Sequence, residues 1–228
     1  MPITKQSSAS NAIYDEIKSR IINLHYFPGY KLSETRLASE FSVGRSPIRS
    51  AFARLLSEGW IEVSPQSGTY VRKLGEKEIA EIFEYRLILE VHATRLATKN
   101  ISDKKLIQLR QAFNQLRPKK KVSRAGLNSF DSFNELDSLF HAEIYRAAGN
   151  SLIKDTLLDL HDKVRWLKRL SPSTPSRMLD LFTELELILR SLERRSPNEG
   201  AKYMRQHIEN AADFGADLRA LAAKPAQK

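Results

Sequence analysis

The stretch Gly44–Trp60, GRSPIRSAFARLLSEGW, decides the fold of the first part of the chain. Its apolar residues recur at the spacing of one helix face, at Ile48, Phe52, Leu55 and Leu56. Ser46 suits the N-cap of this helix, Pro47 its first position and Gly59 its end, because each residue type is favoured there. The stretch therefore predicts an amphipathic helix with one apolar face.

The segments around this helix complete a small domain. An earlier helix ends before Phe27-Pro28-Gly29, and its helically spaced isoleucines are Ile13, Ile17, Ile21 and Ile22. A second helix is predicted after Ser33, a favoured N-cap residue, and the turn at 42–44 leads into the third. The alternating runs WIEV (60–63) and TYVR (69–72) flank SPQSG and predict a β-hairpin. This order of elements predicts a winged helix-turn-helix.

Two arginines stand at the N-terminal end of the third helix, where the helix dipole disfavours each cation by roughly 0.3 to 1 kcal/mol. In a winged helix-turn-helix, this end enters the major groove of DNA, where an arginine on a guanine edge contributes about 1 to 3 kcal/mol. The expected DNA-contacting residues of this helix are Arg45, Ser46, Arg49 and Ser50. Arg36, in the second helix, is expected to contact a phosphate.

The composition narrows the function classes. The 228 residues carry a formal net charge of +10 and a pI near 9.8, which favours a polyanionic partner, nucleic acid before an anionic membrane. The absence of cysteine excludes disulfides, thiolate zinc sites and cysteine nucleophiles. The polar faces of the amphipathic helices mix both signs of charge, which disfavours a membrane surface. With neither a signal peptide nor a long apolar segment, a cytoplasmic protein is expected.

Beyond about residue 74, long amphipathic helices replace the short elements. One helix face between Glu76 and Lys99 has an arginine in its middle, and it comprises Ile79, Phe83, Arg86, Leu89, Ala93 and Leu96. A buried arginine needs a partner that offsets the loss of water. Glu90, four residues after Arg86, is one candidate, and a carboxylate ligand is the other.

Two further apolar faces carry residues that can ligate a metal. Asp137 and His141 are four residues apart, so they lie one above the other on a helix and can meet one metal ion. His207 stands in the middle of the apolar face of the last helix. A hydrogen-bonded role in the core is the alternative for both histidines.

Residues 27–71, FPGYKLSETRLASEFSVGRSPIRSAFARLLSEGWIEVSPQSGTYV, resemble the GntR family of bacterial transcription regulators. The family elements PG, LSE, LA, an SRxPVR-like run, LxxxG and GxxV occur in order and at family spacing. The resemblance implies that Arg45 and Arg49 contact the operator, and that Gly68 lets the wing approach the minor groove. The chain departs at Gly44, where the family more often has Ser or Thr, which puts one phosphate contact in doubt.

The second part resembles the FCD ligand-binding domain of FadR-type regulators, from about residue 76 to 222. The matching motifs are EYRLILE (84–90), DxxxH (137–141), AAGN (147–150) and MRQHI (204–208). Many such domains hold a divalent metal with one aspartate and three histidines, and a small organic acid binds on the metal and nearby polar groups.

This chain departs from the FCD pattern at one ligand, because Leu185 stands where the third histidine is expected, directly after Glu184. The remaining ligands for zinc, nickel or manganese are Asp137, His141 and His207. Water or the effector carboxylate must then complete the shell, and the metal affinity should fall. In the metal-free alternative, Arg86 and the two histidines receive an anion.

The chain is thus expected to be mainly α, with a winged helix-turn-helix domain at 1–74 and an all-helical, FCD-like effector-binding and dimerisation domain at 75–228. The expected function is a homodimeric transcriptional regulator that binds a double-stranded DNA operator under control of a small carboxylate effector. A C-terminal domain that only dimerises, without effector or metal, is the alternative. An enzyme is not expected, because no phosphate loop, nucleophile motif or further base accompanies the three candidate ligands.

Overall fold

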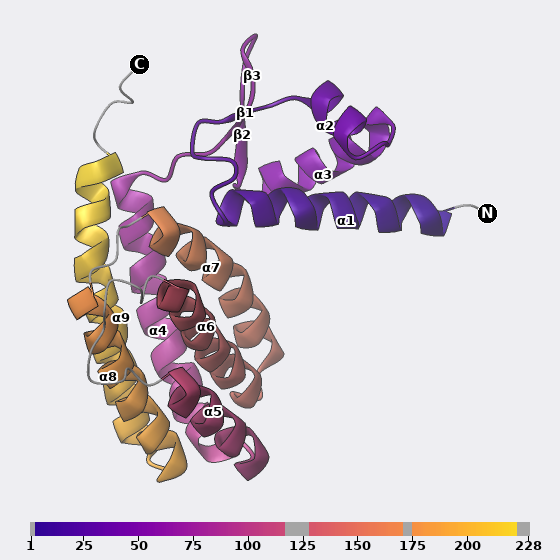
Figure 1. Cartoon of the computed structure of the whole chain (residues 1–228). Coiled ribbons are helices and arrows are strands. Elements are labelled where there is room, and N and C mark those ends of the chain that lie inside the picture. Colours follow the sequence, from indigo (N-terminus) through magenta and orange to yellow (C-terminus); the bar gives the residue numbers. More distant parts are fainter. Residues whose placement is uncertain (1–2, 117–127, 171–174, 223–228) are drawn as a thin grey trace. The chain divides into compact units, whose positions relative to one another are not determined.

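The computed structural model describes residues 3–116, 128–170 and 175–222, and the chain divides into two compact units, Met1–Leu74 and Gly75–Lys228 (Figure 1). Within the described ranges the chain is mainly α-helical with one small sheet. The predicted fold class is therefore confirmed.

In the first unit, helices and a small antiparallel sheet surround one apolar core (Figure 1). Its elements are α1 (Ile3–Ile22), β1 (Lys31–Leu32), α2 (Glu34–Glu40), α3 (Arg45–Ser57), β2 (Ile61–Ser64) and β3 (Gly68–Val71). α1 packs against α3, and the fully buried side chains of this pair include Ile17, Ile21, Ile48 and Leu55. The apolar rows of the sequence thus form the core of a winged helix-turn-helix, except that Leu56, predicted on the buried face of α3, is 45% exposed.

The sheet contains one more strand than the sequence predicts. β3 lies between β1 and β2, with Lys31 opposite Tyr70 and Ile61 opposite Val71. The predicted hairpin of β2 and β3 is confirmed. β1 was missed because two residues are too few to show an alternating pattern.

The start of α3 differs from the prediction, whereas the start of α2 agrees with it. α3 begins at Arg45 with an extended Gly44 as its N-cap, so Ser46 is a residue of the first turn and not the cap. Proline is tolerated throughout the first turn, where backbone N–H groups have no partner in the helix, so Pro47 does not fix the first residue. At α2, the Ser33 side chain accepts a hydrogen bond from the Arg36 backbone N–H at 3.3 Å, as predicted.

A half-buried carboxylate joins the end of α3 to α1. The Tyr14 hydroxyl donates to Glu58, which also accepts from Arg54 Nε at 3.0 Å and from Trp60 Nε1 at 3.2 Å. Burial raises the pKa of Tyr14 to about 12, and its hydrogen bond to Glu58 adds to this shift. Burial also acts to raise the pKa of Glu58, but the bonds from Tyr14 and Arg54 lower it overall.

Glu58 should make the stability of the first unit depend on acid pH. Because its pKa is lower folded than unfolded, its contribution is present above the unfolded pKa of about 4.3 and is lost as pH falls through the folded pKa. In a Trp166→Phe background, the urea midpoint reported by Trp60 fluorescence should therefore drop between pH 5 and pH 3. Glu58→Gln should lower the urea midpoint at pH 7 and make its fall between pH 5 and pH 3 smaller. An equal fall with and without this substitution would show that Glu58 does not cause the acid dependence.

The second unit is a helical bundle. Its elements are α4 (Glu76–Asn100), α5 (Asp103–Leu116), α6 (Asn128–Ala147), α7 (Ser151–Leu170), α8 (Pro175–Glu193) and α9 (Pro197–Ala222). α4 packs along α9, and a Cβ at Gly200 would lie 2.9 Å from the Thr98 hydroxyl, so glycine permits this close approach. None of the helices in the described ranges has the length and apolarity that crossing a membrane requires.

Candidate functional site

In the first unit, α3 exposes the residues predicted to contact DNA. The exposed positions are Arg45, Ser46, Arg49 and Ser50. Pro47, Ile48 and Ala51 lie between and beside them and are buried. Since both sets follow the helical period, packing of the apolar side of α3 turns the polar side outward.

Arg49 of α3 and Arg36 of α2 make surface contacts with other side chains of the unit. Arg49 Nε donates to Glu34 Oε2 at 2.9 Å, and the Arg49 side chain stays 65% exposed. Arg36 Nη1 donates to the exposed Tyr30 hydroxyl at 3.2 Å. Contacts of this kind contribute little in water, so both guanidinium groups can exchange them for phosphates or bases.

Gly68 is required by the backbone of the hairpin. It pairs with Ser64 across β2 and β3, its φ is +129°, and a Cβ there would lie 2.9 Å from the Lys31 side chain.

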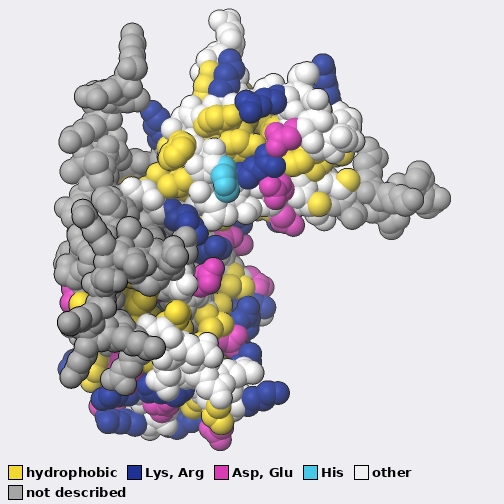
Figure 2. All heavy atoms as spheres, viewed as in Figure 1, with side chains coloured by type: hydrophobic (Ala, Val, Ile, Leu, Met, Phe, Trp, Pro, Cys, Tyr) yellow, Lys and Arg dark blue, Asp and Glu magenta, His cyan; other side chains and the backbone are white. Residues whose placement is uncertain are grey.

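On the face of the molecule shown in Figure 2, Lys and Arg side chains are interspersed with Asp and Glu. The cations are therefore not collected into one lysine-rich stripe on that face.

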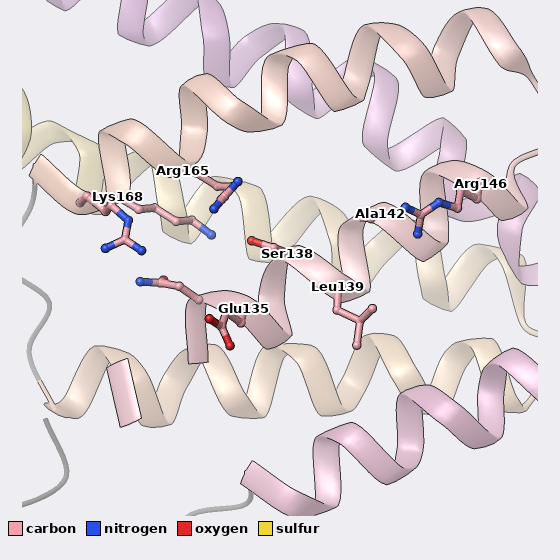
Figure 3. Close-up of a pocket in the computed structure, with 9 residues that line it drawn as sticks. Glu135, Ser138, Leu139, Ala142, Arg146, Arg165 and Lys168 are labelled. Atoms are coloured by element: carbon pink, nitrogen blue, oxygen red, sulfur yellow. The ribbon is translucent and has the colours of Figure 1, made fainter. Parts of the chain in front are cut away.

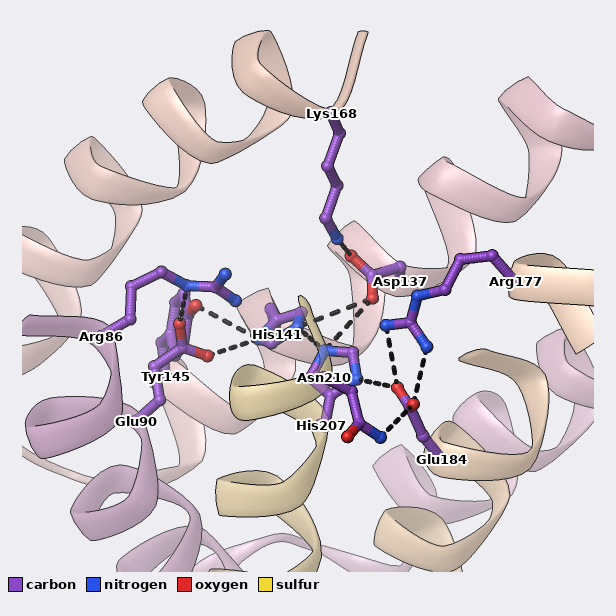
Figure 4. Close-up of polar contacts among 10 residues, drawn as sticks. All are labelled: Arg86, Glu90, Asp137, His141, Tyr145, Lys168, Arg177, Glu184, His207 and Asn210. Carbon is purple, nitrogen blue, oxygen red and sulfur yellow. Dashed lines mark hydrogen bonds and ion pairs between the residues drawn. The ribbon is translucent and has the colours of Figure 1, made fainter. Parts of the chain in front are cut away.

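A polar cluster lies inside the helical bundle of the second unit (Figure 4). Its residues come from α4 and α6 to α9, and they include Arg86, Glu90, Asp137, His141, Tyr145, Lys168, Arg177, Glu184, His207 and Asn210. Six of them are at most 1% exposed: Arg86, Glu90, Asp137, His141, Tyr145 and His207. Charged groups at such depth are tolerated only when their partners are well placed.

The structure brings the three predicted metal ligands together. His141 Nε2 lies 3.1 Å from His207 Nε2, and each of these nitrogens lies 3.6 Å from Asp137 Oδ1. Ligands of a tetrahedral zinc ion, at bond lengths near 2.0 to 2.1 Å, are separated by about 3.3 to 3.4 Å. The triangle therefore fits one divalent ion to within a few tenths of an ångström.

Carboxylates hold the other nitrogen of both histidines. His141 Nδ1 lies 2.6 Å from Glu90 Oε2, and His207 Nδ1 lies 2.9 Å from Glu184 Oε2. Each Nδ1 is therefore assigned a proton, which directs the Nε2 lone pair toward the partner histidine and Asp137. Metal-binding histidines commonly have such a carboxylate partner, which fixes the tautomer and the ring orientation.

The two histidines differ in how the cluster shifts their pKa values. Burial acts to lower the pKa of His141, but the carboxylates of Glu90 and Asp137 raise it overall. Burial lowers the pKa of His207, and the hydrogen bond to Glu184 opposes this shift only in part. His207 thus favours the neutral form that a metal requires.

Lys168 is a member of the cluster that the sequence did not predict. Its Nζ lies 2.5 Å from Asp137 Oδ2, the oxygen not directed at the histidines. Burial acts to raise the pKa of Asp137, but Lys168 and His141 hold it well below its usual value. A metal on Asp137 would share this carboxylate with an ammonium group, which weakens the attraction.

Arg86 has both an internal partner and unused donors. Its Nε donates to Glu90 Oε1 at 2.6 Å, which confirms the partner that the four-residue spacing suggests. Its two Nη groups are buried and have no hydrogen-bond partner among the described residues. Because unpaired buried donors are costly, these groups favour a site that receives an anion.

Leu185 is 1% exposed and adds no ligand, while its neighbour Glu184 points into the cluster. Glu184 accepts from Arg177 and Asn210, each at 2.7 Å, besides His207. Burial acts to raise the pKa of Glu184, but the bonds from His207 and Arg177 lower it to about 2.

His161 is a second residue that the sequence did not predict here. Its ring centre lies 5.4 Å from that of His141, and neither ring nitrogen has a hydrogen-bond partner in the described ranges. Burial and the nearby His141 lower the pKa of His161 to about 3. Its apolar helix face in α7 carried no spacing signal, because its neighbours in the cluster come from other helices.

A winged helix-turn-helix followed by an all-helical unit with a buried polar cluster is the architecture of a DNA-binding transcription regulator. Residues 9–71 match the model of bacterial regulatory proteins of the gntR family, and residues 81–210 match the FCD domain. The chain therefore belongs to the GntR family and carries an FCD domain.

Curated relatives and solved structures agree with this assignment. The HTH-type transcriptional repressor RspR of Escherichia coli K12 is 29% identical over 210 residues, which span 91% of this chain and 89% of RspR. The gluconate operon transcriptional repressor of Bacillus licheniformis is 38% identical over 139 residues, 60% of this chain and 54% of that protein. These relatives are regulators, so the expectation of a non-enzyme is confirmed.

The fold also matches that of a solved regulator. The crystal structure of a GntR regulator from Rhodococcus sp. RHA1 superposes with a TM-score of 0.75 at 17% identity, covering 96% of this chain and all of that one. This similarity supports the fold of the chain.

Proposed function

We propose that this GntR-family regulator senses a small carboxylate, with residues 1–74 binding the operator and residues 75–228 binding the effector and dimerising. The observation that carries the proposal is the triangle of Asp137, His141 and His207. Two imidazole nitrogens 3.1 Å apart, each 3.6 Å from a carboxylate oxygen in a buried site, would be stabilised by a divalent cation held among them.

The metal would be held by Asp137, His141 and His207, with zinc, nickel or manganese as candidates. Glu90 and Glu184 would orient the two imidazoles from outside the coordination shell. A divalent ion at this site supplies positive charge and an open coordination position for a carboxylate.

The effector carboxylate would bind between this triangle and Arg86. The unpaired Nη groups of Arg86 are buried donors in the same cluster, and a carboxylate is the acceptor that matches a guanidinium group best. Binding would change DNA affinity if the two conformations of the regulator differ in their affinity for the acid.

On the operator, Arg45 and Arg49 would contact bases or phosphates in the major groove, with Ser46 and Ser50 beside them. Arg36 would contact a phosphate, and Gly68 would let the wing approach the minor groove. In a homodimer, two such faces would bind the two halves of a near-palindromic operator.

The test is thermal unfolding of the chelator-treated full chain with a panel of small carboxylic acids, each with and without zinc, nickel or manganese. Stabilisation that requires both acid and metal is the expected result, because a ligand stabilises the folded state in proportion to its occupancy. Stabilisation by acid alone would assign the site to Arg86 without a metal.

The alternative is a second unit that dimerises without an effector. Two observations favour it: the apolar Leu185 at the expected histidine position, and Lys168 on Asp137. It predicts that no acid or metal shifts the unfolding temperature of the chain.

A further inference from the structure

A pocket of about 340 Å³ lies between α6 and α7, lined by side chains of both helices (Figure 3). Its α6 residues, such as Ala142 and Arg146, lie on a side of α6 next to the face that buries His141 in the bundle. The lining includes none of the residues proposed to bind the effector, and Lys168 is the residue that the pocket shares with the polar cluster.

Positive charge dominates the lining of this pocket. Its cationic residues are Arg146, Arg165, Lys168 and Arg169, and the lining carboxylate is Glu135. Figure 3 shows Arg165 and Lys168 of α7 on one side and Glu135 and Ser138 of α6 facing them. Such a concentration of cations around a concave surface raises the local concentration of anions.

The carboxylates that contact Arg146, Arg165 and Lys168 do not line the pocket. Arg146 contacts Glu143 at 2.6 Å, and that carboxylate is shared with Lys105 at 3.3 Å. Arg165 approaches Asp162 only to 3.5 Å. These contacts are partly exposed and worth little, so an anion inside the pocket can compete for the cations.

We propose that this pocket binds a small organic anion with two or more negative charges. A singly charged acid would contact one cation and gain little in water, whereas a multivalent anion can contact arginines of both helices at once. Ser138 adds a hydroxyl that can donate to an oxygen of the anion. The volume lies at the lower end of the range of about 300 to 1,000 Å³ for small-molecule sites.

Lys168 links this pocket to the candidate metal centre. Its side chain lines the pocket, while its Nζ contacts Asp137 Oδ2 at 2.5 Å. An anion that draws the ammonium group into the pocket would free this carboxylate for a cation. Binding of the anion and of the metal would then favour each other, because coupling between two sites is reciprocal. This link rests on the proposed metal site, whereas the pocket itself does not.

The pocket is tested by isothermal titration calorimetry of the chelator-treated full chain with pyrophosphate and citrate, and with acetate as the singly charged reference. We expect pyrophosphate or citrate to bind more tightly than acetate, and Arg165→Gln to weaken that binding by about tenfold or more. Arg205→Gln removes the same charge from the exposed surface of α9 and should leave the affinity unchanged. Equal effects of the two substitutions, or no binding by either probe, would overturn the proposal.

The link is tested with Lys168→Met, with Lys154→Met as the control from the same helix. Lys168→Met should weaken pyrophosphate or citrate binding and raise zinc affinity, since it removes the ammonium group from Asp137. Lys154 pairs with Asp155 at 3.0 Å and lies outside the pocket lining, so its loss should change neither. An unchanged zinc affinity in Lys168→Met would overturn the link, while a lack of zinc binding in every variant would count against the metal proposal alone.

Discussion

Arg49→Ala is expected to weaken operator binding by about tenfold to a hundredfold, the loss that follows when one good arginine contact to a base is removed. Arg49 is exposed at the start of α3, and its side chain pairs with Glu34 of α2. The alanine leaves the buried face of α3 unchanged, so far-UV circular dichroism should not change. Operator affinity is measured by fluorescence anisotropy at fixed salt, because phosphate contacts make the affinity depend on ionic strength.

The matched control for this prediction is Arg95→Ala. Arg95 is an exposed arginine of α4 in the second unit, so its removal lowers the net charge equally without touching α3. Operator binding should fall for Arg49→Ala and stay near the wild-type value for Arg95→Ala. Equal losses would mean that overall charge, and not a contact made by Arg49, determines the affinity.

His141→Ala is expected to lower zinc affinity by more than about a hundredfold. Removal of even an outer-shell partner of a metal ligand costs about 10- to 100-fold, and His141 would supply one of three direct ligands. Zinc affinity is measured by competition with a chromophoric chelator. Zinc affinity is expected to be highest in the wild type, lower in Glu184→Gln and lowest in His141→Ala. Glu184→Gln acts on the metal through His207 and removes no direct ligand.

Two controls separate loss of a ligand from loss of the fold. His92→Ala removes an exposed histidine of α4 and should leave zinc affinity unchanged. His141→Gln keeps a polar side chain in the buried site and should also lose the metal, while circular dichroism reports whether the bundle remains folded. Zinc bound equally by wild type and both His141 variants would place the metal elsewhere in the chain.

The fold could be predicted mainly where one residue pattern decided it. The apolar row from Ile48 to Leu56 was sufficient to predict that α3 is a helix, and Ser33 to predict where α2 starts. Helical spacing and N-cap preference both depend on residues close together in the sequence. The start of α3 was predicted too late, since Pro47 fits any position of a first turn. β1 exists only through its pairing with β3, which no local pattern reveals.

In the candidate site, too, the residues that share a helix face could be predicted from the sequence, and those that come together by packing between helices could not. Asp137 and His141 share a helix face, and so do Arg86 and Glu90, so spacing alone placed these pairs together. Lys168 and His161 reach the cluster from α7, and their positions depend on how α7 packs against α6. Tertiary packing of this kind leaves no periodic trace in a single sequence.

The ion pair between Glu34 and Arg49 has a consequence for the entropy of recognition. A free arginine loses up to about 2 kcal/mol of rotamer freedom when it is immobilised. Glu34 already restricts the Arg49 side chain before DNA arrives, and their exposed pair, worth at most about 1 kcal/mol, is weak enough to be given up. The free Arg49 side chain thus has less rotamer freedom left to lose than an unpaired arginine would have. If Arg49 contacts the operator as proposed, Glu34 would influence operator affinity from the neighbouring helix.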